Sequence, residues 1–563
     1  MFSKISSILF LLIVKIMRDF DMVSRKTAEE MGREQKEISI SEFFEKNKHL
    51  LGFDNPTKAL LMCVKEAVDN SLDACEESGI LPDIVVKVKQ TKDESFKITI
   101  QDNGPGIVKD QITRVFGKLL YGSKFHKLKQ GRGQQGIGIS ACVLYSQLTT
   151  GNSTKIWSKT ENDKKTHYYE IQINTKKNEP EIVKEEVQES NFDHGVKIEL
   201  DVSGRYRKWV EDFLRQTSIS NPFAKIIYTA PDGTKTTFPR TANELPKLAK
   251  EMKPHPHGVE FGILQRMASV TSSRTVTSFI TNDFSSVGST TSKEICKIAK
   301  VDESKKPADL SREDIEKILN AITKVKIQRP PTDCLSPVGK DDLEKSLKRE
   351  FPGAEFIAVR SRDPDVYRGF PFMIEVAVVY GGDIKNESGE LIRFANKVPL
   401  LYQAGACATS EAVKETDWKR YGLQQANNSL PTGPMIILVH MCSVWVPFVS
   451  ESKEAIAPYP DIVKEMKLAL QDIGRELSRY VSGKRRAGEA KRRVLLFERY
   501  STEVAEALAT LSGKNKAELE KKLKSYIGDR VKITEEGEVE GIEGAKEKAP
   551  PEEKAKGKKD DEE

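Results

Sequence analysis

Three short segments between residues 66 and 138 constrain this chain more than any other feature of its sequence. They read Glu-Ala-Val-Asp-Asn-Ser-Leu-Asp at 66–73, Asp-Asn-Gly-Pro-Gly at 102–106 and Gly-Arg-Gly-Gln-Gln-Gly-Ile-Gly at 131–138. Together they supply a carboxylate to activate water, an amide to hold a metal ion, a carboxylate to bind a base and a flexible loop for phosphates. Each segment alone is weak evidence, because turns and helix caps use similar residues. Their combination predicts a nucleotide site.

The first segment lies on a helix predicted over residues 58–78, which a capping asparagine and a proline precede. Glu66, Asn70 and Asp73 are spaced by four and three residues, so they share one face opposite an apolar stripe. An amide between two carboxylates suits Mg²⁺, and Glu66, one turn away, can act as general base on a retained water. A solvated polar face is the alternative interpretation.

The second segment begins at Asp102, just beyond a β-strand predicted over residues 96–100. A carboxylate there can accept a hydrogen bond from an exocyclic amine, and Gly104 and Gly106 allow the backbone to approach a flat base. The third segment precedes a predicted helix whose free amide groups would face phosphate oxygens. A turn and a helix cap are the alternatives for these two segments.

The order of the segments resembles the Bergerat ATPase fold of gyrase-type topoisomerases, MutL mismatch-repair proteins, sensor histidine kinases and a major chaperone class. The P-loop pattern GxxxxGK[ST] does not occur in the sequence. Longer segments narrow the resemblance to the archaeal B subunits of DNA topoisomerase VI, across residues 24–500. These segments are residues 37–53, 66–84, 119–140, 329–339 and 452–457.

The resemblance implies the ATPase subunit of a type IIB DNA topoisomerase, with ATP and Mg²⁺ as cofactors. Two copies would dimerise on ATP binding and gate the passage of double-stranded DNA, relaxing supercoils or decatenating DNA. A separate A subunit would cleave the DNA, in an A2B2 heterotetramer. Lys453 stands where the family places a lysine that reaches the γ-phosphate. We therefore expect Lys453 to be catalytic together with the general base Glu66, and we expect Asn70 to bind the metal.

The other nucleotide contacts follow from residues that match the family's motifs. They are Asn70, Asp73, Asp102, Gly104, Gly106, Ser123, Lys124, Arg132, Gly133, Gln134, Gln135, Gly136, Ile137, Gly138 and Ile139.

The resemblance and changes in composition predict an α+β multidomain chain. Its parts are a Bergerat (GHKL) ATPase α/β sandwich, a helix-two-turns-helix insert, a transducer domain like domain 2 of ribosomal protein S5, and a long C-terminal helix with a disordered tail. The chain is expected to begin with an extension that suggests a misplaced start codon (1–23) and a dimerisation strap (24–54). The ATPase (55–240), the helical insert (259–334) and the transducer (335–470) are expected to follow. A helical region that contacts the A subunit (471–530) and a charged tail (531–563) are expected at the end.

Within the later domains, periodicity predicts particular elements. The transducer is expected to form a small sheet with helices on one side. Its predicted strands are residues 356–359, 372–379, 392–399 and 434–447. Two short helices are predicted in the helical insert, at 291–300 and 312–324, and a long helix is predicted at 461–511.

Composition limits the partners and the compartment. The net charge of the 563 residues is only +6, so contact with DNA requires local patches, which we expect on the helical insert and the basic stretch at 484–493. The seven cysteines form no CxxC pair and indicate buried, reduced thiols in a cytoplasmic protein. The apolar run at residues 8–14 is too short to span a bilayer, so no membrane association is expected.

Two other classes of protein remain open. A MutL-like or chaperone-like clamp would use the same pocket to close around DNA or a client. A histidine kinase needs a phospho-accepting histidine on a long dimerisation helix before the pocket, where His49 is the only histidine. Association with an A subunit and ATP-dependent relaxation of DNA would distinguish these classes.

Overall fold

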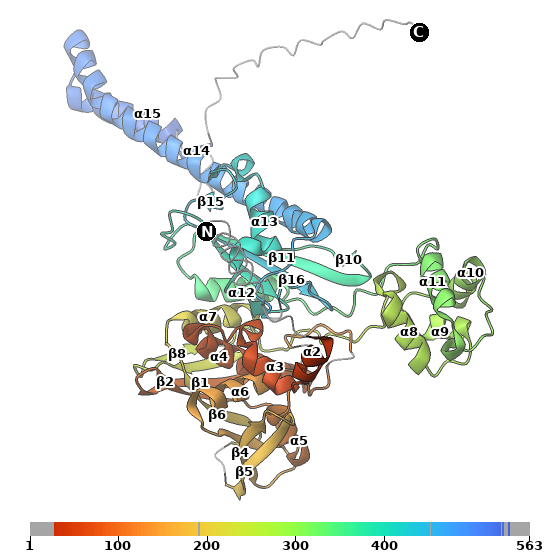
Figure 1. Cartoon of the computed structure of the whole chain (residues 1–563). Coiled ribbons are helices and arrows are strands. Elements are labelled where there is room, and N and C mark those ends of the chain that lie inside the picture. Colours follow the sequence, from red (N-terminus) through yellow and green to blue (C-terminus); the bar gives the residue numbers. More distant parts are fainter. Residues whose placement is uncertain are drawn as a thin grey trace, which may run out of the picture.

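The computed structural model describes residues 27–124, 127–133, 136–189, 192–450, 452–530, 532–533 and 539–540. Within these residues the chain forms two large β-sheets with helices, a separate helical unit and a long projecting helix (Figure 1). The predicted N-terminal extension and nearly all of the predicted tail lie outside the described residues. Among the described helices, none has the length and apolar character needed to cross a membrane.

The first sheet has eight strands in the order β5-β4-β3-β6-β2-β1-β7-β8. Only the pairing of β1 with β7 is parallel. Alternate residues of the central strands are buried, because one face of this sheet packs against helices. The strands are β1 (Asp83–Lys92), β2 (Ser95–Gln101), β3 (Thr154–Lys159), β4 (Thr166–Asn174), β5 (Glu179–Gln188), β6 (Gly195–Ser203), β7 (Lys225–Thr229) and β8 (Lys235–Phe238).

Four helices supply the other side of this core: α4 (Pro56–Glu77), α5 (Lys109–Gly117), α6 (Gly138–Thr150) and α7 (Trp209–Ser220). Helix α4 begins where its cap predicts, since the side chain of Asn55 accepts a hydrogen bond from the Thr57 amide. Most of α4 is buried, including the charged side chains of Lys65, Asp69 and Asp73. Buried charges require partners. Lys65 and Asp69 pair with each other, and Asp73 pairs with Lys124 and Arg132.

The segment predicted as a strap forms α2 (Ala28–Glu34), α3 (Ile40–Lys46) and the 3₁₀ helix η1 (Lys48–Leu51). It lies against the β4–β5 turn of its own chain, where Ser41 Oγ donates a 3.1 Å hydrogen bond to Asn178 Oδ1. Asn178 also bonds the amide and carbonyl of Leu119. The segment is therefore connected to the start of the glycine-rich region that leads to α6.

The helical unit has a hydrophobic core of its own and lies to one side of both sheets (Figure 1). Its elements are the 3₁₀ helices η2 (Pro256–Gly258) and η3 (Pro307–Asp309) and the helices α8 (Phe261–Val270), α9 (Val276–Asp283), α10 (Ser289–Ala299) and α11 (Arg312–Ile322). The last two helices agree with the predicted helices at 291–300 and 312–324.

The second sheet follows the order β10-β11-β16-β12-β13, and β9 pairs with β11 off this path. Its strands are β9 (Phe356–Ser361), β10 (Asp365–Tyr367), β11 (Phe370–Tyr380), β12 (Glu390–Ala395), β13 (Val398–Pro399) and β16 (Met435–Ser443). The prediction of one continuous strand at 392–399 is wrong. Asn396 and Lys397, with φ of 48° and 68°, form a two-residue hairpin turn that reverses the chain between β12 and β13.

The second sheet also carries helices on both faces, so the prediction of helices on one side is wrong. Helix α12 (Lys340–Glu350) packs on one face together with Ile219 of α7, while α13 (Ala408–Glu415) and α14 (Pro460–Ser512) cover the other. Residues of the central strand β16 are buried toward both faces, which explains its continuous apolar sequence. The remaining elements are η4 (Ala404–Ala406), η5 (Trp418–Tyr421), β14 (Gln424–Gln425), β15 (Pro431–Thr432), α15 (Lys516–Arg530), β17 (Lys532–Ile533) and β18 (Val539–Glu540).

The separate core of the helical unit predicts that it can be destabilised locally. Phe279 is fully buried there, so Phe279→Ala should cost about 3–5 kcal/mol. Hydrogen exchange should accelerate in residues 261–322 and remain slow in the first sheet. Val270→Ala is the matched control, because Val270 is 76% exposed and its truncation should leave exchange unchanged. Equal acceleration in the first sheet would contradict a separate core.

Candidate functional site

A cavity of about 640 Å³ lies between α4, the loop after β2, the glycine-rich segment before α6 and the loop that follows β16. It brings together most of the residues predicted to bind a nucleotide. Those that line it are Glu66, Asn70, Asp73, Asp102, Gly106, Ser123, Lys124, Gly133, Gly136, Ile137, Gly138, Ile139 and Lys453.

Two predicted residues are absent from the cavity lining. They are Gly104, whose amide donates to Asp102, and Arg132, whose side chain is buried against Asp73. Gln134 and Gln135 lie outside the described residues.

Glu66 lies directly beside the first turn of α6. A Cβ built on Gly138 would be 1.8 Å from Glu66 Oε2, so the carboxylate can approach this helix only because residue 138 is glycine. On its other side, Lys65 Nζ is 3.4 Å from Glu66 Oε1. The arrangement places a carboxylate next to a helix N-terminus, whose free amide groups favour anions.

Asn70 lies one turn further along α4 and is exposed within the cavity. The backbone of Gly133 passes close to it, since a Cβ on Gly133 would be 3.8 Å from Asn70 Oδ1. An accessible amide oxygen beside a glycine-rich segment fits Mg²⁺, which takes oxygen ligands and keeps several waters and phosphate oxygens. The donor set therefore fits a magnesium nucleotide.

Asp102 is held at the end of β2 by three hydrogen bonds. Its Oδ2 accepts from Ser71 Oγ at 2.8 Å, and its Oδ1 accepts from the amides of Gly104 and Val196 at 2.9 and 3.1 Å. Burial raises the pKa of this carboxyl above its usual value. A carboxylate has about four acceptor positions, so one remains for a further donor such as the exocyclic amine of a base.

Asp73, which lines the cavity, anchors a buried cluster of charges. Its oxygens lie 2.6 Å from Lys124 Nζ and 2.7 Å from Arg132 Nη1. Burial alone would raise the pKa of Asp73, but these two cations lower it below its usual value. Asp73 is therefore ionised, and Lys124 is bound to it rather than directed into open solvent.

Arg132 completes this cluster from the glycine-rich segment. Its side chain is 3% exposed and also lies 2.6 Å from Glu76 Oε1 and beside the side-chain oxygen of Asn221. Glu76 was not predicted from the sequence, although it stands three residues after Asp73 on the same helix. Asn221 was not predicted either, because no local pattern connects that residue to a segment 89 positions earlier.

Lys453 enters the cavity from the second sheet. Its Nζ donates a 3.1 Å hydrogen bond to the backbone carbonyl of Arg132. Burial lowers the pKa of this amine below its usual value. The lysine thus forms a direct contact between the two halves of the protein at the cavity.

A second buried ion pair, between Lys65 and Asp69, lies next to Glu66 on α4. Lys65 Nζ lies 3.4 Å from Asp69 Oδ2 as well as 3.4 Å from Glu66 Oε1. Burial raises the pKa of Asp69 to about 6, and Asp69 Oδ1 has no hydrogen-bond partner among the residues that the structure describes. The spacing of Lys65 and Asp69, four residues apart on a helix, is a signal that sequence reasoning could have used.

Comparisons with known proteins match both halves of the structure. Residues 59–201, which include most of α4, Asp102 and the glycine-rich segment, match the family described as histidine kinase-, DNA gyrase B-, and HSP90-like ATPase. Residues 330–493, which include the second sheet and Lys453, match the family described as topoisomerase VI B subunit, transducer.

Three curated relatives are named as the B subunit of type 2 DNA topoisomerase 6. The protein of Methanococcoides burtonii is 46% identical and covers 86% of this chain and 78% of its own length. That of Archaeoglobus fulgidus is 49% identical, with 81% of this chain and 76% of its own length covered. The protein of Pyrococcus furiosus is 36% identical over 92% of this chain and 99% of its own length.

The geometry at Asp102 predicts a selective loss of ATP affinity in Asp102→Asn. The amide oxygen can still accept from the Gly104 and Val196 amides, and the Ser71 hydroxyl can accept from the new amide nitrogen, so the fold should persist. The amine of adenine would then meet a donor, which should weaken binding by about 1–3 kcal/mol.

Calorimetric titration with ATP measures this change. Asp93→Asn in the exposed β1–β2 turn is the matched control and should bind ATP as the wild type does. Unchanged affinity of Asp102→Asn would limit Asp102 to a role in the turn.

Proposed function

Since the chain belongs to the family of type 2 DNA topoisomerase 6 B subunits, we propose that it is the ATP-binding and ATP-hydrolysing subunit of a DNA topoisomerase VI. The observation that supports this most strongly is the cavity shared by the two sheets. Glu66, Asn70 and Asp102 enter it from the first sheet and its helices, and Lys453 enters it from the second. A nucleotide bound there would contact both halves of the protein.

The roles of the residues follow from their positions. Asp102 accepts from the amine of adenine, and the first turn of α6 with the glycine-rich segment binds the phosphates. Asn70 would hold Mg²⁺, which offsets the charge of the phosphates when bound. Glu66 takes a proton from the attacking water, and its position beside α6 keeps it close to the phosphates.

Lys453 is proposed to bind the terminal phosphate in place of the Arg132 carbonyl that it now contacts. An ammonium that exchanges a neutral carbonyl for a phosphate gains a stronger, charge-assisted interaction. Because Lys453 is attached to the second sheet, ATP binding would pull the second sheet toward the first. Hydrolysis would release this contact.

The proposed assembly contains two copies of this chain and two A subunits that cleave the DNA. ATP binding would close the dimer, with residues 24–54 reaching the partner copy, and so control the passage of one duplex through another. The proposed division of labour assigns ATP to residues 55–240, a helix-two-turns-helix insert to 259–334, transduction to 335–470 and A-subunit contact to 471–530.

Reconstitution with an A subunit tests the proposal, and Glu66→Ala gives the decisive variant. The wild-type pair should relax supercoiled DNA only when ATP is supplied. Glu66→Ala should still bind ATP, while turnover and relaxation fall by about 10²- to 10⁴-fold, the usual contribution of a general base.

Glu66→Gln is the matched control for the loss of side-chain volume. It should hydrolyse ATP and relax DNA as slowly as Glu66→Ala does. Near-normal hydrolysis by either variant would remove Glu66 from its role. ATP hydrolysis without relaxation by the wild-type pair would indicate a clamp of the MutL or chaperone type.

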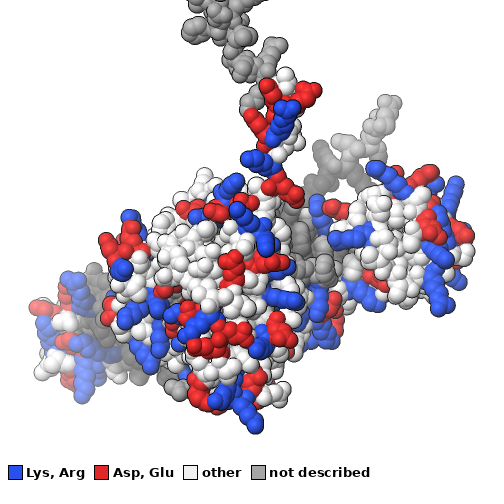
Figure 2. Space-filling model, turned by 60° about the horizontal axis from the view of Figure 1, so that its bottom comes forward, with Lys and Arg blue, Asp and Glu red and all other residues white. Residues whose placement is uncertain are grey.

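DNA contact is proposed for the exposed basic stretch on α14. Figure 2 shows Lys and Arg interspersed with Asp and Glu over the visible face, so binding needs a local concentration of cations. Part of the stretch is already paired within the chain, because Lys484 bonds Glu355 and Arg485 lies 3.6 Å from Glu489. The remaining positive charge is available to phosphates.

Replacement of Arg485, Arg486, Arg492 and Arg493 with alanine should therefore weaken DNA-stimulated ATP turnover and spare DNA-free turnover. The slope of log affinity against log salt should flatten by about 0.9 for each phosphate that the variant no longer binds. Alanine at the exposed residues Lys87, Lys89, Lys92 and Lys235 is the matched control for net charge. An unchanged slope, together with failure to bind the A subunit, would identify the stretch as a protein interface.

A further inference from the structure

A buried lysine of the second sheet extends the charge cluster beneath the nucleotide cavity. Lys397 Nζ lies 3.6 Å from Glu76 Oε1, the same oxygen that lies 2.6 Å from Arg132 Nη2. Lys397 Nζ also donates a 3.0 Å hydrogen bond to Ser336 Oγ. The side chains of Lys397 and Arg132 are each 3% exposed, so Glu76 is a shared counter-charge that neither cation can replace with water.

The backbone at Lys397 is unusual for a lysine. Asn396 and Lys397 both have positive φ in a two-residue hairpin turn, where the second position usually favours glycine. A non-glycine residue in this conformation carries a cost of about 1–3 kcal/mol. Its persistence points to a use for the lysine side chain at this position.

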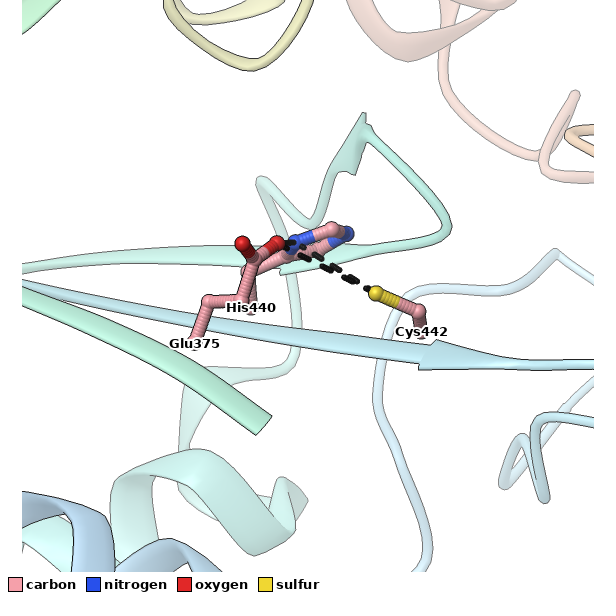
Figure 3. Close-up of side chains that lie close together, drawn as sticks. All are labelled: Glu375, His440 and Cys442. Atoms are coloured by element: carbon pink, nitrogen blue, oxygen red, sulfur yellow. Dashed lines mark hydrogen bonds and ion pairs between the residues drawn. The ribbon is translucent and has the colours of Figure 1, made fainter. Parts of the chain in front are cut away.

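The turn is fixed from the centre of the second sheet. The Lys397 amide donates a 2.9 Å hydrogen bond to His440 Nε2, and His440 Nδ1 lies 2.8 Å from Glu375 Oε2 (Figure 3). Because Nε2 accepts, Nδ1 carries the proton and donates it to Glu375. Glu375 also accepts from the amides of Val338 and Gly339, which fixes the carboxylate at the start of α12.

This arrangement argues against a metal at Glu375, His440 and Cys442, although the three side chains lie close enough to share one. Both nitrogens of His440 are engaged, one with the Lys397 amide and one with Glu375. Burial raises the pKa of Cys442 well above its usual value, which keeps it a thiol. The cluster serves to hold the turn.

The same turn also reaches Arg132 through a second route. The carbonyl of Lys397 accepts from Ser220 Oγ at 2.6 Å and from Asn221 Nδ2 at 3.2 Å. The side-chain oxygen of Asn221 in turn accepts from Arg132. Arg132 is thus bound to the turn by way of Glu76 and by way of Asn221.

We propose that Lys397 is a positioning residue that couples the state of the nucleotide site to the second sheet. Lys397 lies outside the cavity, but Arg132 pairs with Asp73 on the cavity wall and offers its carbonyl to Lys453. A nucleotide that moves Lys453 or Asp73 therefore changes the surroundings of Arg132, and Glu76 passes this change to Lys397 and the turn. The inference rests on the proposed function, because it assigns a second contact through which that site acts on the transducer.

The test compares ATP hydrolysis and DNA relaxation in the same reaction, with the full chain bound to its A subunit at saturating ATP. Lys397→Met should lower relaxation about tenfold, within the usual range of coupling between sites, while ATP turnover stays within about twofold of the wild type. Lys397→Arg, which keeps the charge, should recover part of the relaxation. Lys385→Met is the matched control, because Lys385 is exposed in the same domain and its loss should leave both rates unchanged.

The double variant Glu76→Gln/Lys397→Met removes opposite charges together, so the net charge of the cluster is unchanged and Arg132 keeps its ion pair with Asp73. It should relax DNA no more slowly than Lys397→Met alone, because both changes interrupt the same connection. A normal ratio of relaxation to hydrolysis in Lys397→Met and in the double variant would overturn the inference. Parallel loss of both rates with a lower Tm would also overturn it, in favour of a purely structural role. Absence of relaxation by the wild-type pair would instead refute the proposed function.

Discussion

The interaction on which the rest of the structure depends is the burial of Arg132 between Asp73 and Glu76. A guanidinium with almost no exposure must keep its partners, because an uncompensated buried charge is strongly unfavourable. Both carboxylates belong to α4, while Arg132 belongs to the glycine-rich segment, so their pairing sets where this segment lies. The backbone carbonyl of Arg132 then accepts the hydrogen bond from Lys453 of the second sheet. Buried ion pairs contribute little net stability, so we interpret this one as a device that specifies geometry.

The sequence predicted the elements whose signals are local. Helix α4 has a capping asparagine, a proline at its first position and a regular apolar stripe, and its observed bounds differ little from the predicted 58–78. Strand β5 was missed because it is an edge strand rich in charged, exposed residues, so it shows no alternation. The short strands β7 and β8 lacked a pattern long enough to detect. Most predicted cavity residues do line the cavity, because their first segment lies on a predicted helix, the second directly follows a predicted strand and the third directly precedes a predicted helix.

Contacts between distant segments could not be predicted in this way. The sequence suggested Arg132 as a nucleotide contact, but its orientation depends on Asn221 and Glu76, which no spacing rule connects to it. The turn at Asn396 and Lys397 was hidden for a related reason. Neither residue is glycine, and the flanking residues are apolar, so the stretch resembles one continuous strand. The hydrogen bonds that hold Asn396 come from Ser443 on another strand, and they are visible only in the folded chain.

The length of α14 gives small movements of the second sheet a large effect. Its 53 residues extend for about 80 Å, and its first half is packed against the sheet while the second half projects beyond it (Figure 1). A rotation of about 5° at the packed end would displace the far end of such a rod by roughly 7 Å. Proline, which is one common cause of a kink in a helix, occurs in α14 only at its first turn. A small rotation of the second sheet would therefore be carried along α14 to its far end as a displacement of several ångströms.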